Sequence, residues 1–441
     1  MDAQTIEQLR PRLRRFLSEF DDCFGRREPA AHLRTYVDGQ LSDLPRKSIE
    51  PIALEFDTPP RTLQQFLSGA HWLEDLMRDR LAEFIARHYT HPDAVGIIDE
   101  TSYAKKGTKT PGVKRQYCGS TGKKDNCTVT VHLAYAAPKG LRVLLDGELF
   151  LPEDWAADRN RCREAGIPED MVHRPKWQIA LDLRDRAVAN GVTLPWMTFD
   201  EQYGKVPQFL HDLDDRGQWY VGEVPRNFHG WCRRPVRLHK KHASARGRTL
   251  KVQNPPTSWV EDLGRHSPAF HEQDWQTFYI KDGSKGPIVW QAKFAEFYLP
   301  RDGQPSRPHW LIVARNALKH AEVKYFVSNA PLNTKPQTLL RVAFGRYPIE
   351  RAFEDDKTEI GMDHFEVRNY RSLKRHLLIS AVSLLFLAHI HQQDRGGKSG
   401  PDGLPDSHSR QCDDPVALDD RRQTPSLLAA PGGQHSVHAA A

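Results

Sequence analysis

The prediction of the fold depends on the stretch Phe344-Gly-Arg-Tyr-Pro-Ile-Glu-Arg-Ala-Phe-Glu-Asp-Asp-Lys357. Its apolar residues recur at near-helical spacing and proline is tolerated in a first helical turn, so we expect a helix to begin near Tyr347. Glu350 and Lys357 are 357 − 350 = 7 positions apart, and therefore share one face of that helix. A carboxylate and an ammonium on one face suit a site where a metal ion meets a phosphate. An ordinary amphipathic helix with solvated charges is the alternative.

The composition is that of a globular protein with a modest basic excess. The 441 residues allow two or three domains, 39% of them are hydrophobic, and the formal net charge is +6. The six cysteines are scattered without a Cys-x-x-Cys pair, so neither a disulfide framework nor a zinc ribbon is indicated, and a reducing cytoplasm is expected. No signal peptide is visible. The longest apolar stretch, Leu377 to Ile390, is shorter than the about 20 residues that cross a bilayer and predicts a buried core helix.

Residues 1–90 are predicted to form a helical N-terminal domain, with apolar residues three or four apart. Within it, residues 46–56 and 61–67 indicate two short helices joined by a turn. A helix-turn-helix reader of DNA would offer Arg61, Gln64 and Gln65 to a groove. A plain helical hairpin is the other interpretation.

From Ala94 onward the pattern changes to strands. Residues 94–99, 128–136 and 141–151 predict an antiparallel meander, and residues 194–200 a further strand that ends in a carboxylate. We expect a mixed α/β catalytic domain formed by residues 91–225 and 329–392.

Residues 226–328 are predicted to be a β-rich basic insertion in that domain, with strands near 275–281, 288–297 and 309–315. Arg233 to Lys251 holds eight cations and no acid, which indicates an arm that contacts phosphates or else a solvated loop. The eight are Arg233, Arg234, Arg237, Lys240, Lys241, Arg246, Arg248 and Lys251. His239 and His242 have no second pair nearby to complete a metal site. Residues 393–441 are expected to be a disordered tail.

Three carboxylates are candidate metal ligands. Asp99 and Asp200 end predicted strands and Glu350 lies on the predicted helix. Acids at strand ends point into a crevice, and oxygen ligands favour Mg²⁺ or Mn²⁺ over zinc. Two such ions about 4 Å apart support cleavage and transfer of a phosphodiester strand. Spacing does not exclude three rival ligands, Glu100, Glu201 and Glu354.

Several blocks of the chain, in order, resemble bacterial insertion-sequence transposases. Around the first acid stands Ile97-Ile-Asp-Glu-Thr-Ser-Tyr-Ala-Lys-Lys-Gly107, followed by Arg115-Gln-Tyr-Cys-Gly-Ser-Thr-Gly-Lys-Lys-Asp-Asn-Cys127. The second acid stands in Phe199-Asp-Glu-Gln-Tyr-Gly204, similar to the family's Asp-x-x-Tyr-Gly. The third-acid signature, Tyr-x2-Arg-x3-Glu-x6-Lys, is matched except at its tyrosine, which is Ala343 here; Phe344 or Tyr347 is available to fill that space.

These blocks, from about residue 46 to 387, are similar to the broad insertion-sequence-four group and its sister family seven-hundred-one, which have a DDE site on an RNase H-like fold. The resemblance implies a cut-and-paste transposase that cleaves and joins DNA at inverted-repeat ends and target DNA. It also implies a homodimer in the DNA complex and a cytoplasmic, nucleoid-associated location.

The resemblance also assigns roles to single residues. Asp99, Asp200 and Glu350 would hold two Mg²⁺ ions, with Mn²⁺ as a substitute. DNA contacts would come from a set of cations: Arg346, Lys357, Lys105, Lys106, Arg233, Arg234, Lys240 and Lys241. In some relatives an aromatic residue of the β-rich insertion stacks on a flipped base; the candidates here are Trp231, Trp259, Trp275, Trp290 and Trp310. Core packing is the other role open to them.

Two other functions fit parts of the pattern. A DNA-binding protein of transposase descent that no longer cuts would keep the same blocks. A carboxylate-pair glycosidase would need only two acids and no basic arm. Intact Asp99, Asp200 and Glu350 favour an active transposase.

Overall fold

The computed structural model describes residues 3–236, 238–239, 252–253, 255–283 and 286–396. The chain divides into two units, Met1–Arg395 and Gly396–Ala441, and all described residues but the last belong to the first unit. The predicted tail therefore lies outside the described residues apart from residues 393–396, which continue the last helix. Lys240 and Lys241 also lie outside them.

The chain begins with a group of helices, as the periodicity predicts. They are α1 (Ala3–Leu17), the 3-10 helix η1 (Ser18–Cys23), α2 (Arg27–Leu41), α3 (Ile49–Glu55), α4 (Pro60–Ser68) and α5 (Glu74–Tyr89). α3 and α4 are the two short helices expected between residues 46 and 67. Leu63, Phe66 and Leu67 bury one face of α4, which leaves Arg61, Gln64 and Gln65 exposed on the other.

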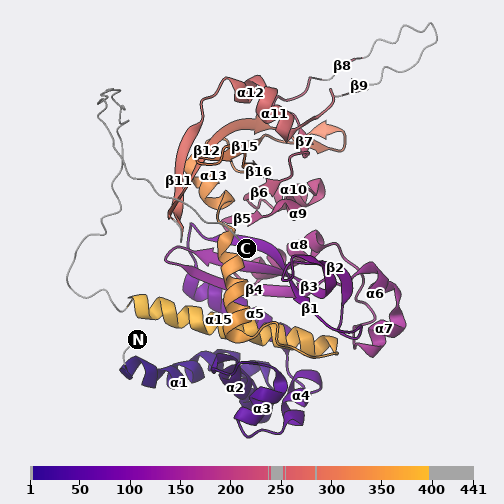
Figure 1. Cartoon of the computed structure of the whole chain (residues 1–441), viewed down its shortest axis with the longest axis vertical. Helices are drawn as coiled ribbons and strands as arrows, with labels where there is room; N and C mark the ends of the chain where they lie inside the picture. The colour runs from indigo at the N-terminus through magenta and orange to yellow at the C-terminus, as the bar shows by residue number, and fades with distance from the viewer. Residues whose placement is uncertain (1–2, 237, 240–251, 254, 284–285, 397–441) are drawn as a thin grey trace, which may run out of the picture. The chain divides into compact units, whose positions relative to one another are not determined.

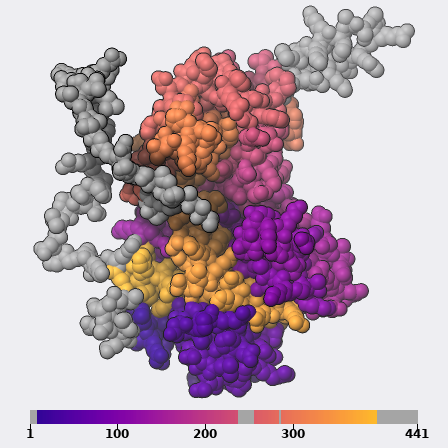
Figure 2. All heavy atoms as spheres, viewed as in Figure 1, coloured from indigo at the N-terminus to yellow at the C-terminus, as the bar shows by residue number. Residues whose placement is uncertain are grey.

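A long helix near the C-terminus, α15 (Tyr370–Gly396), packs against this group. The Tyr36 hydroxyl lies 2.9 Å from His376 Nδ1, and Gln40 donates to Ser380 Oγ at 2.8 Å. Orange and yellow atoms of the C-terminal segments accordingly lie beside the indigo N-terminal helices in Figure 2. The helix over residues 370–394 is long and apolar enough to cross a membrane, but 78% of its apolar 18-residue stretch is buried inside the protein, as expected of a core helix.

The described strands include a ten-stranded sheet (Figure 1). Its order is β11-β12-β15-β16-β6-β5-β1-β3-β2, and β4 also pairs with β3. The strands are β1 (Val95–Ala104), β2 (Lys114–Cys118), β3 (Lys123–Ala137), β4 (Leu141–Leu149), β5 (Trp196–Phe199), β6 (Tyr220–Val224), β11 (Gln276–Gly283), β12 (Gly286–Phe297), β15 (His309–Asn316) and β16 (Val323–Ser328). β1, β3 and β4 form the predicted antiparallel meander, whereas β5 runs parallel to β1 and to β6.

Shorter elements connect and cover this sheet. The helices are α6 (Glu153–Ala157), α7 (Arg159–Glu164), α8 (Lys176–Ala189), α9 (Glu201–Gly204), α10 (Pro207–Asp215), α11 (Val260–His266), α12 (Pro268–His271), α13 (Pro336–Ala343) and α14 (Tyr347–Asp355). Two-residue strands pair outside the main sheet: β7 (His229–Gly230), β8 (Leu238–His239), β9 (Val252–Gln253), β10 (Ser258–Trp259), β13 (Pro300–Arg301) and β14 (Gln304–Pro305).

The three strand runs expected within residues 226–328 are present, and their arrangement goes beyond the sequence prediction. β16 pairs antiparallel with β6, so β16, β15, β12 and β11 extend the same sheet that contains β1. Pairing across the sheet depends on residues about 100 positions apart, such as Val221 and Ser328, which local patterns do not reveal.

α14 begins at Tyr347 with Pro348 in its first turn, where the missing N–H costs no hydrogen bond. A π-helical turn, η2 (Asp356–Ile360), follows directly and ends at Gly361, whose φ of 77° is a left-handed conformation that glycine adopts easily. The helix therefore places Glu350 near its start and Lys357 in the π turn.

Candidate active site

The first two acids are brought together by the parallel pairing of β1 and β5. Ile98 pairs with Phe199, so Asp99 and Asp200 are the next residues along each strand. Asp99 is 8% exposed and its Oδ1 accepts a hydrogen bond from the Glu100 amide at 2.8 Å. Asp200 begins α9, where its Oδ1 accepts from the Gln202 amide at 2.9 Å, an ordinary N-cap bond.

A close approach of α9 to β6 fixes the Asp200 turn. A Cβ at Gly204 would lie 1.9 Å from the carbonyl oxygen of Glu223, so no other residue fits there without a backbone shift. Tyr203 is buried beside this turn. These contacts account for the Tyr-Gly pair that follows the second acid in the sequence.

Arg346 joins the first and third acids. Its Nη1 lies 2.6 Å from Asp99 Oδ2 and its Nη2 lies 2.7 Å from Glu350 Oε1. The Arg346 side chain is 29% exposed and that of Glu350 48%. One guanidinium thus holds the start of α14 against β1, and two of the three predicted acids share it.

Burial dominates the electrostatics of the cluster. It raises the pKa of Asp99 to about 7, with the neighbouring Asp200 carboxylate adding to the rise and Arg346 opposing it. Burial also raises the pKa of Asp200, and Arg346 again opposes the rise. Two desolvated carboxylates that repel each other are costly at neutral pH, and a cation between them relieves the cost.

The donor set fits a hard divalent cation. Asp99 and Asp200 offer carboxylate oxygens, and two further polar atoms, Tyr203 Oη and Glu100 Oε2, are buried without a hydrogen-bond partner among the described residues. A hydrated ion would supply those partners. Across the described ranges, however, no three His, Cys, Asp or Glu side chains are already gathered closely enough to hold a metal, because Arg346 stands between Asp99 and Glu350.

The rival acids have other surroundings. Glu100 pairs with Lys176 at 2.7 Å, and its carboxylate lies close enough to Asp99 and Asp200 to raise the pKa of each. Glu354 pairs with Arg351 at 2.5 Å. Glu201 is exposed at the start of α9. Glu100 therefore borders the Asp99 and Asp200 pair and stays a rival ligand.

Two of the predicted DNA-binding lysines have internal partners. Lys357 donates to Thr101 Oγ1 at 2.6 Å, and burial lowers its pKa. Lys105 donates to the carbonyl oxygen of Phe365 at 2.7 Å with its ammonium 3.4 Å from the centre of the Phe365 ring, and burial lowers its pKa to about 8. Both ammonium groups therefore fasten the segment around η2 to β1. Lys106, in contrast, is exposed.

The candidate DNA-binding residues of the predicted insertion also include both exposed and buried side chains. Arg233 and Arg234 are exposed. Trp259 is 54% exposed, whereas Trp290 is buried and stacks on Phe344 with ring centres 4.7 Å apart. Phe344 is partly buried and packs against Trp290 and Phe326, whereas Ala343, which stands where the resembling family has tyrosine, is buried.

A cavity of about 420 Å³ lies next to Glu350 and Arg346. Strands β11, β12 and β16 contribute Lys281, Trp290 and Lys324 to its lining. Sequence reasoning missed Lys281 and Lys324 because each is an ordinary alternating strand residue. Only the pairing of the distant strands brings them beside the third acid.

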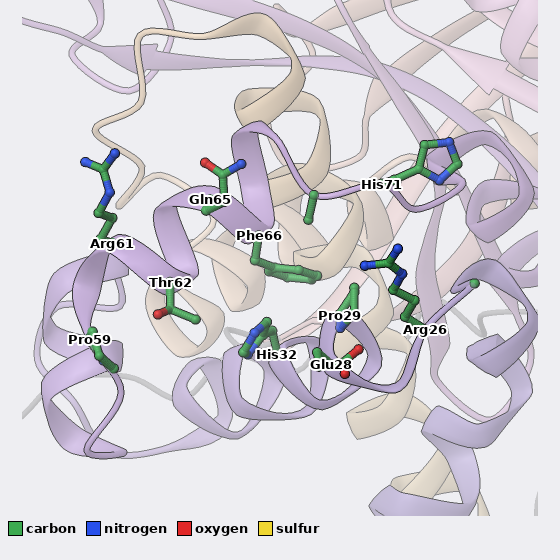
Figure 3. Close-up of a pocket in the computed structure, with 12 residues that line it drawn as sticks. Arg26, Glu28, Pro29, His32, Pro59, Arg61, Thr62, Gln65, Phe66 and His71 are labelled. Carbon is green, nitrogen blue, oxygen red and sulfur yellow. The ribbon is translucent and has the colours of Figure 1, made fainter.

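A larger groove, about 1110 Å³, lies among the N-terminal helices. Figure 3 shows Arg61 and Gln65 projecting from α4, with Arg26 and His71 on the other side of Phe66. Two of the three residues that a helix-turn-helix reader would offer to DNA, Arg61 and Gln65, therefore line this groove.

Comparison with known proteins decides the family. A family described as DDE superfamily endonuclease matches residues 19–287, which is more than half of the chain. The chain belongs to the DDE superfamily endonucleases. The match includes Asp99 and Asp200 and ends before Glu350, so the third acid rests on its sequence motif and on the contacts of Arg346.

A relative of this DDE superfamily endonuclease carries a more specific description. The chain is 32% identical over 192 residues to a protein from Microchaete diplosiphon described as a probable transposase for insertion sequence element IS701. The matched part is 43% of this chain and 47% of the relative, so the chain spans about half of that protein's length. The resemblance inferred from the sequence blocks is confirmed at the level of the family.

Proposed function

We propose that this DDE superfamily endonuclease is a cut-and-paste transposase that cleaves DNA at the inverted-repeat ends of an insertion sequence and joins them to target DNA. The observation that supports the proposal is that Arg346 pairs with both Asp99 and Glu350, while Asp200, at the end of the neighbouring strand, lies close enough to raise the pKa of Asp99. A glycosidase needs two carboxylates and would give the third acid no role.

The strand arrangement supports an RNase H-like catalytic core. The first five strands of such a core, taken here as β1, β3, β4, β5 and β6, lie in the order β4-β3-β1-β5-β6, with the first three antiparallel and the last two parallel to β1. A helical domain over residues 1–90 and an insertion over residues 226–328 would complete it.

In this proposal Asp99, Asp200 and Glu350 are the metal ligands. Bound Mg²⁺, or Mn²⁺ in its place, supplies Lewis-acid activation of the attacking water or hydroxyl and stabilises the leaving oxygen. Arg346 exchanges its carboxylate partners for the scissile phosphate, since a guanidinium binds either anion in the same bidentate way. Lys357 keeps β1 and η2 together while adding positive charge nearby.

Other parts of the chain would hold the DNA and assemble the complex. Arg233, Arg234, Lys106 and the exposed face of α4 are the proposed contacts with DNA, and two subunits would bridge two ends. Trp290 is the one of the five candidate tryptophans that lines the cavity beside Glu350, so it is our choice for stacking on a displaced base. The expected location is the cytoplasm, at the nucleoid.

A strand-cleavage assay tests the proposal. The wild type should cut the DNA that flanks its own gene at paired inverted repeats with Mg²⁺, and Glu350→Gln and Asp200→Asn should each reduce cutting by at least about 10³-fold while DNA affinity stays within about twofold. Glu354→Gln, one helical turn away, is the matched control and should remain active. Cutting by Glu350→Gln would show that another acid is the third ligand.

A catalytically silent DNA-binding protein is the alternative. It would bind the same DNA without cutting it under Mg²⁺ or Mn²⁺. Calorimetric titration with Mn²⁺ separates the two functions independently of cleavage, because a silent protein that has lost its site would bind no more Mn²⁺ than Asp200→Asn does.

A further inference from the structure

The hairpin formed by β2 and β3 presents a basic and aromatic surface that the proposed site does not use. Directly opposite residues in an antiparallel pair share a face, so Arg115 and Asn126, and next Tyr117 and Lys124, lie on one side of the hairpin. Tyr117 is 64% exposed, one of the most exposed large apolar side chains described, and Arg115 and Lys124 are exposed beside it. We call Arg115, Tyr117 and Lys124 the hairpin surface.

The opposite side of the hairpin packs against the protein. Cys118 and Cys127 are buried there with Val129 and Phe150. Lys114, on this side, pairs with Asp154 at 3.0 Å. An aromatic side chain left exposed on the other side, between two cations, is therefore not needed for packing.

The hairpin surface lies on the same face of the sheet as the first acid. Asp99 pairs with His132 of β3, so these two side chains share a face of the sheet. Side chains alternate between the two faces along a strand, and Lys124 is 132 − 124 = 8 residues, an even number, from His132, so Lys124 lies on that same face. At about 3.4 Å per residue, Lys124 lies roughly 27 Å from the level of Asp99 along the strand. That is a length of about eight base pairs of B-form DNA, which rises about 3.4 Å per pair.

The sheet face between these two places is covered by protein, because Thr128, Thr130 and His132 are buried. The segment from Lys105 to Val113 crosses it, held by Asn126 Nδ2, which donates to the carbonyl oxygens of Lys105 and Gly107 at 2.7 Å. Lys106 is exposed on this crossing segment. DNA between the acid cluster and the hairpin would therefore run over this covering segment, on which Lys106 offers an exposed cation.

The charges of the hairpin surface are available to a partner. Arg115 and Lys124 have no ion-pair partner within the part of the chain that the structure describes. Asp125, the acid closest in sequence, stands opposite Gln116 on the other side of the hairpin, and its Oδ1 accepts from the Asn126 amide at 2.8 Å. Unpaired cations around an exposed aromatic ring complement a polyanion with apolar sugar surfaces.

We propose that the hairpin surface binds duplex DNA about eight base pairs to one side of the cleaved phosphodiester, with Arg115 and Lys124 on backbone phosphates and Tyr117 packed against the sugars between them. The inference rests on the proposed function for the position of the cut. It assigns to the β2–β3 hairpin the role of holding the DNA that runs along the sheet away from Asp99.

The first test is the salt dependence of binding to random-sequence duplexes of about 25 base pairs. Loss of two phosphate contacts in Arg115→Gln/Lys124→Gln should reduce the slope of log affinity against log salt by about 1.8. Tyr117→Ala should weaken binding about fivefold with an unchanged slope, because it removes no charge. Lys123→Gln is the matched control: the residue is adjacent to Lys124 and equally charged, but it stands on the other side of the hairpin, and its slope should not change.

The second test uses DNA whose cut position has been mapped in the cleavage assay. Shortening the duplex on one side to fewer than about eight base pairs from the cut should weaken wild-type binding. The double variant Arg115→Gln/Lys124→Gln should already bind the longer duplex weakly, and shortening the duplex should not weaken its binding further. An unchanged melting temperature would show that the variant is folded.

The outcomes separate the two proposals. An unchanged slope in the double variant of a protein whose wild type cuts DNA overturns the hairpin proposal alone, as does an effect confined to single-stranded DNA or an equal effect of Lys123→Gln. A wild type that binds no DNA at low salt overturns both.

Discussion

Two arginines of this chain are held in the interior by different partners. Arg375 on α15 is 1% exposed and donates to the carbonyl oxygens of Phe66, Leu67, Ala70 and Trp72 at 2.9 to 3.3 Å, with Glu74 as its acidic partner at 2.9 Å. Arg346 on the candidate site is partly exposed and has two carboxylates, Asp99 and Glu350, as partners.

The comparison distinguishes an arginine that only stabilises the fold from an arginine whose partners can be replaced by ligands. The guanidinium of Arg375 joins four carbonyl oxygens of one buried loop, and among the described residues only the Phe66 oxygen also accepts from a second side chain, Trp72 Nε1 at 3.1 Å, so Arg375 is fixed once the chain folds. Carboxylates can accept a metal ion in place of a guanidinium, and a guanidinium can accept a phosphate in place of a carboxylate. An arginine paired with carboxylates therefore marks a site where ligands can be exchanged.

The largest effect is expected at Arg375. Arg375→Met should lower the free energy of unfolding by about 3–5 kcal/mol, because it removes a guanidinium donor from the buried loop carbonyls and the nearer of two cations from Glu74. Urea denaturation of the variant measures it. Arg371→Met is the control: its side chain is 54% exposed and lies 3.8 Å from the same Glu74, so its loss should cost less than about 0.5 kcal/mol. Equal effects of the two variants would contradict the architectural role.

The next effect is a pH dependence at His376, which joins α15 to α2. Burial lowers the pKa of His376 to about 4, below its ordinary value of 6.5, so the folded protein holds it neutral. The unfolded chain therefore binds the proton first as the pH falls. The stabilisation is present above pH 6.5 and is lost progressively down to about pH 4, an amount of up to about 3 kcal/mol.

Replacing that histidine should flatten the acid limb of the stability curve. His376→Gln is expected to lose less stability than the wild type between pH 6.5 and pH 4, even if it is less stable at pH 7. Thermal unfolding at a series of pH values measures the difference. His391→Gln, an exposed position of the same helix, should follow the wild-type slope. A slope in His376→Gln equal to that of the wild type would contradict the assignment.

The smallest effect is expected at Arg346. Arg346→Gln removes the cation between Asp99 and Glu350, so Mn²⁺ should bind the protein without DNA about tenfold more tightly, or about 1.4 kcal/mol, by calorimetric titration. Arg351→Gln, on the same helix but paired with Glu354 and Asp355, should leave Mn²⁺ affinity unchanged. Weaker Mn²⁺ binding in Arg346→Gln would show that the arginine orders the ligands and does not compete for them.

Patterns within single elements were predictable from the sequence. The meander of β1, β3 and β4 follows from alternation, the start of α14 from Pro348, and the exposed face of α4 from the spacing of its leucines and phenylalanine. The motif blocks led to the correct family because they record chemistry that a site requires, independently of how the strands pair. The roles of the three acids and of the DNA contacts stay predictions.

Contacts between distant segments were not predictable in this way. Lys105 and Lys357 look in the sequence like cations available to DNA, yet both fasten η2 and the segment after it to β1. A lysine's charge is visible in a sequence, but the carbonyl or hydroxyl oxygen that it meets depends on where a segment about 250 residues away is packed.

The sequence by itself determined the family and the approximate positions of the main strands and of α14, because periodicity, capping residues and motif spacing are local properties of the chain. Only the tertiary structure decided that β11, β12, β15 and β16 extend the catalytic sheet, that Arg346 stands between Asp99 and Glu350, and that Tyr117 faces outward on the side of Asp99. The physical reason is that strand pairing and burial join residues hundreds of positions apart, and their partners determine whether a charge is structural or available for a ligand.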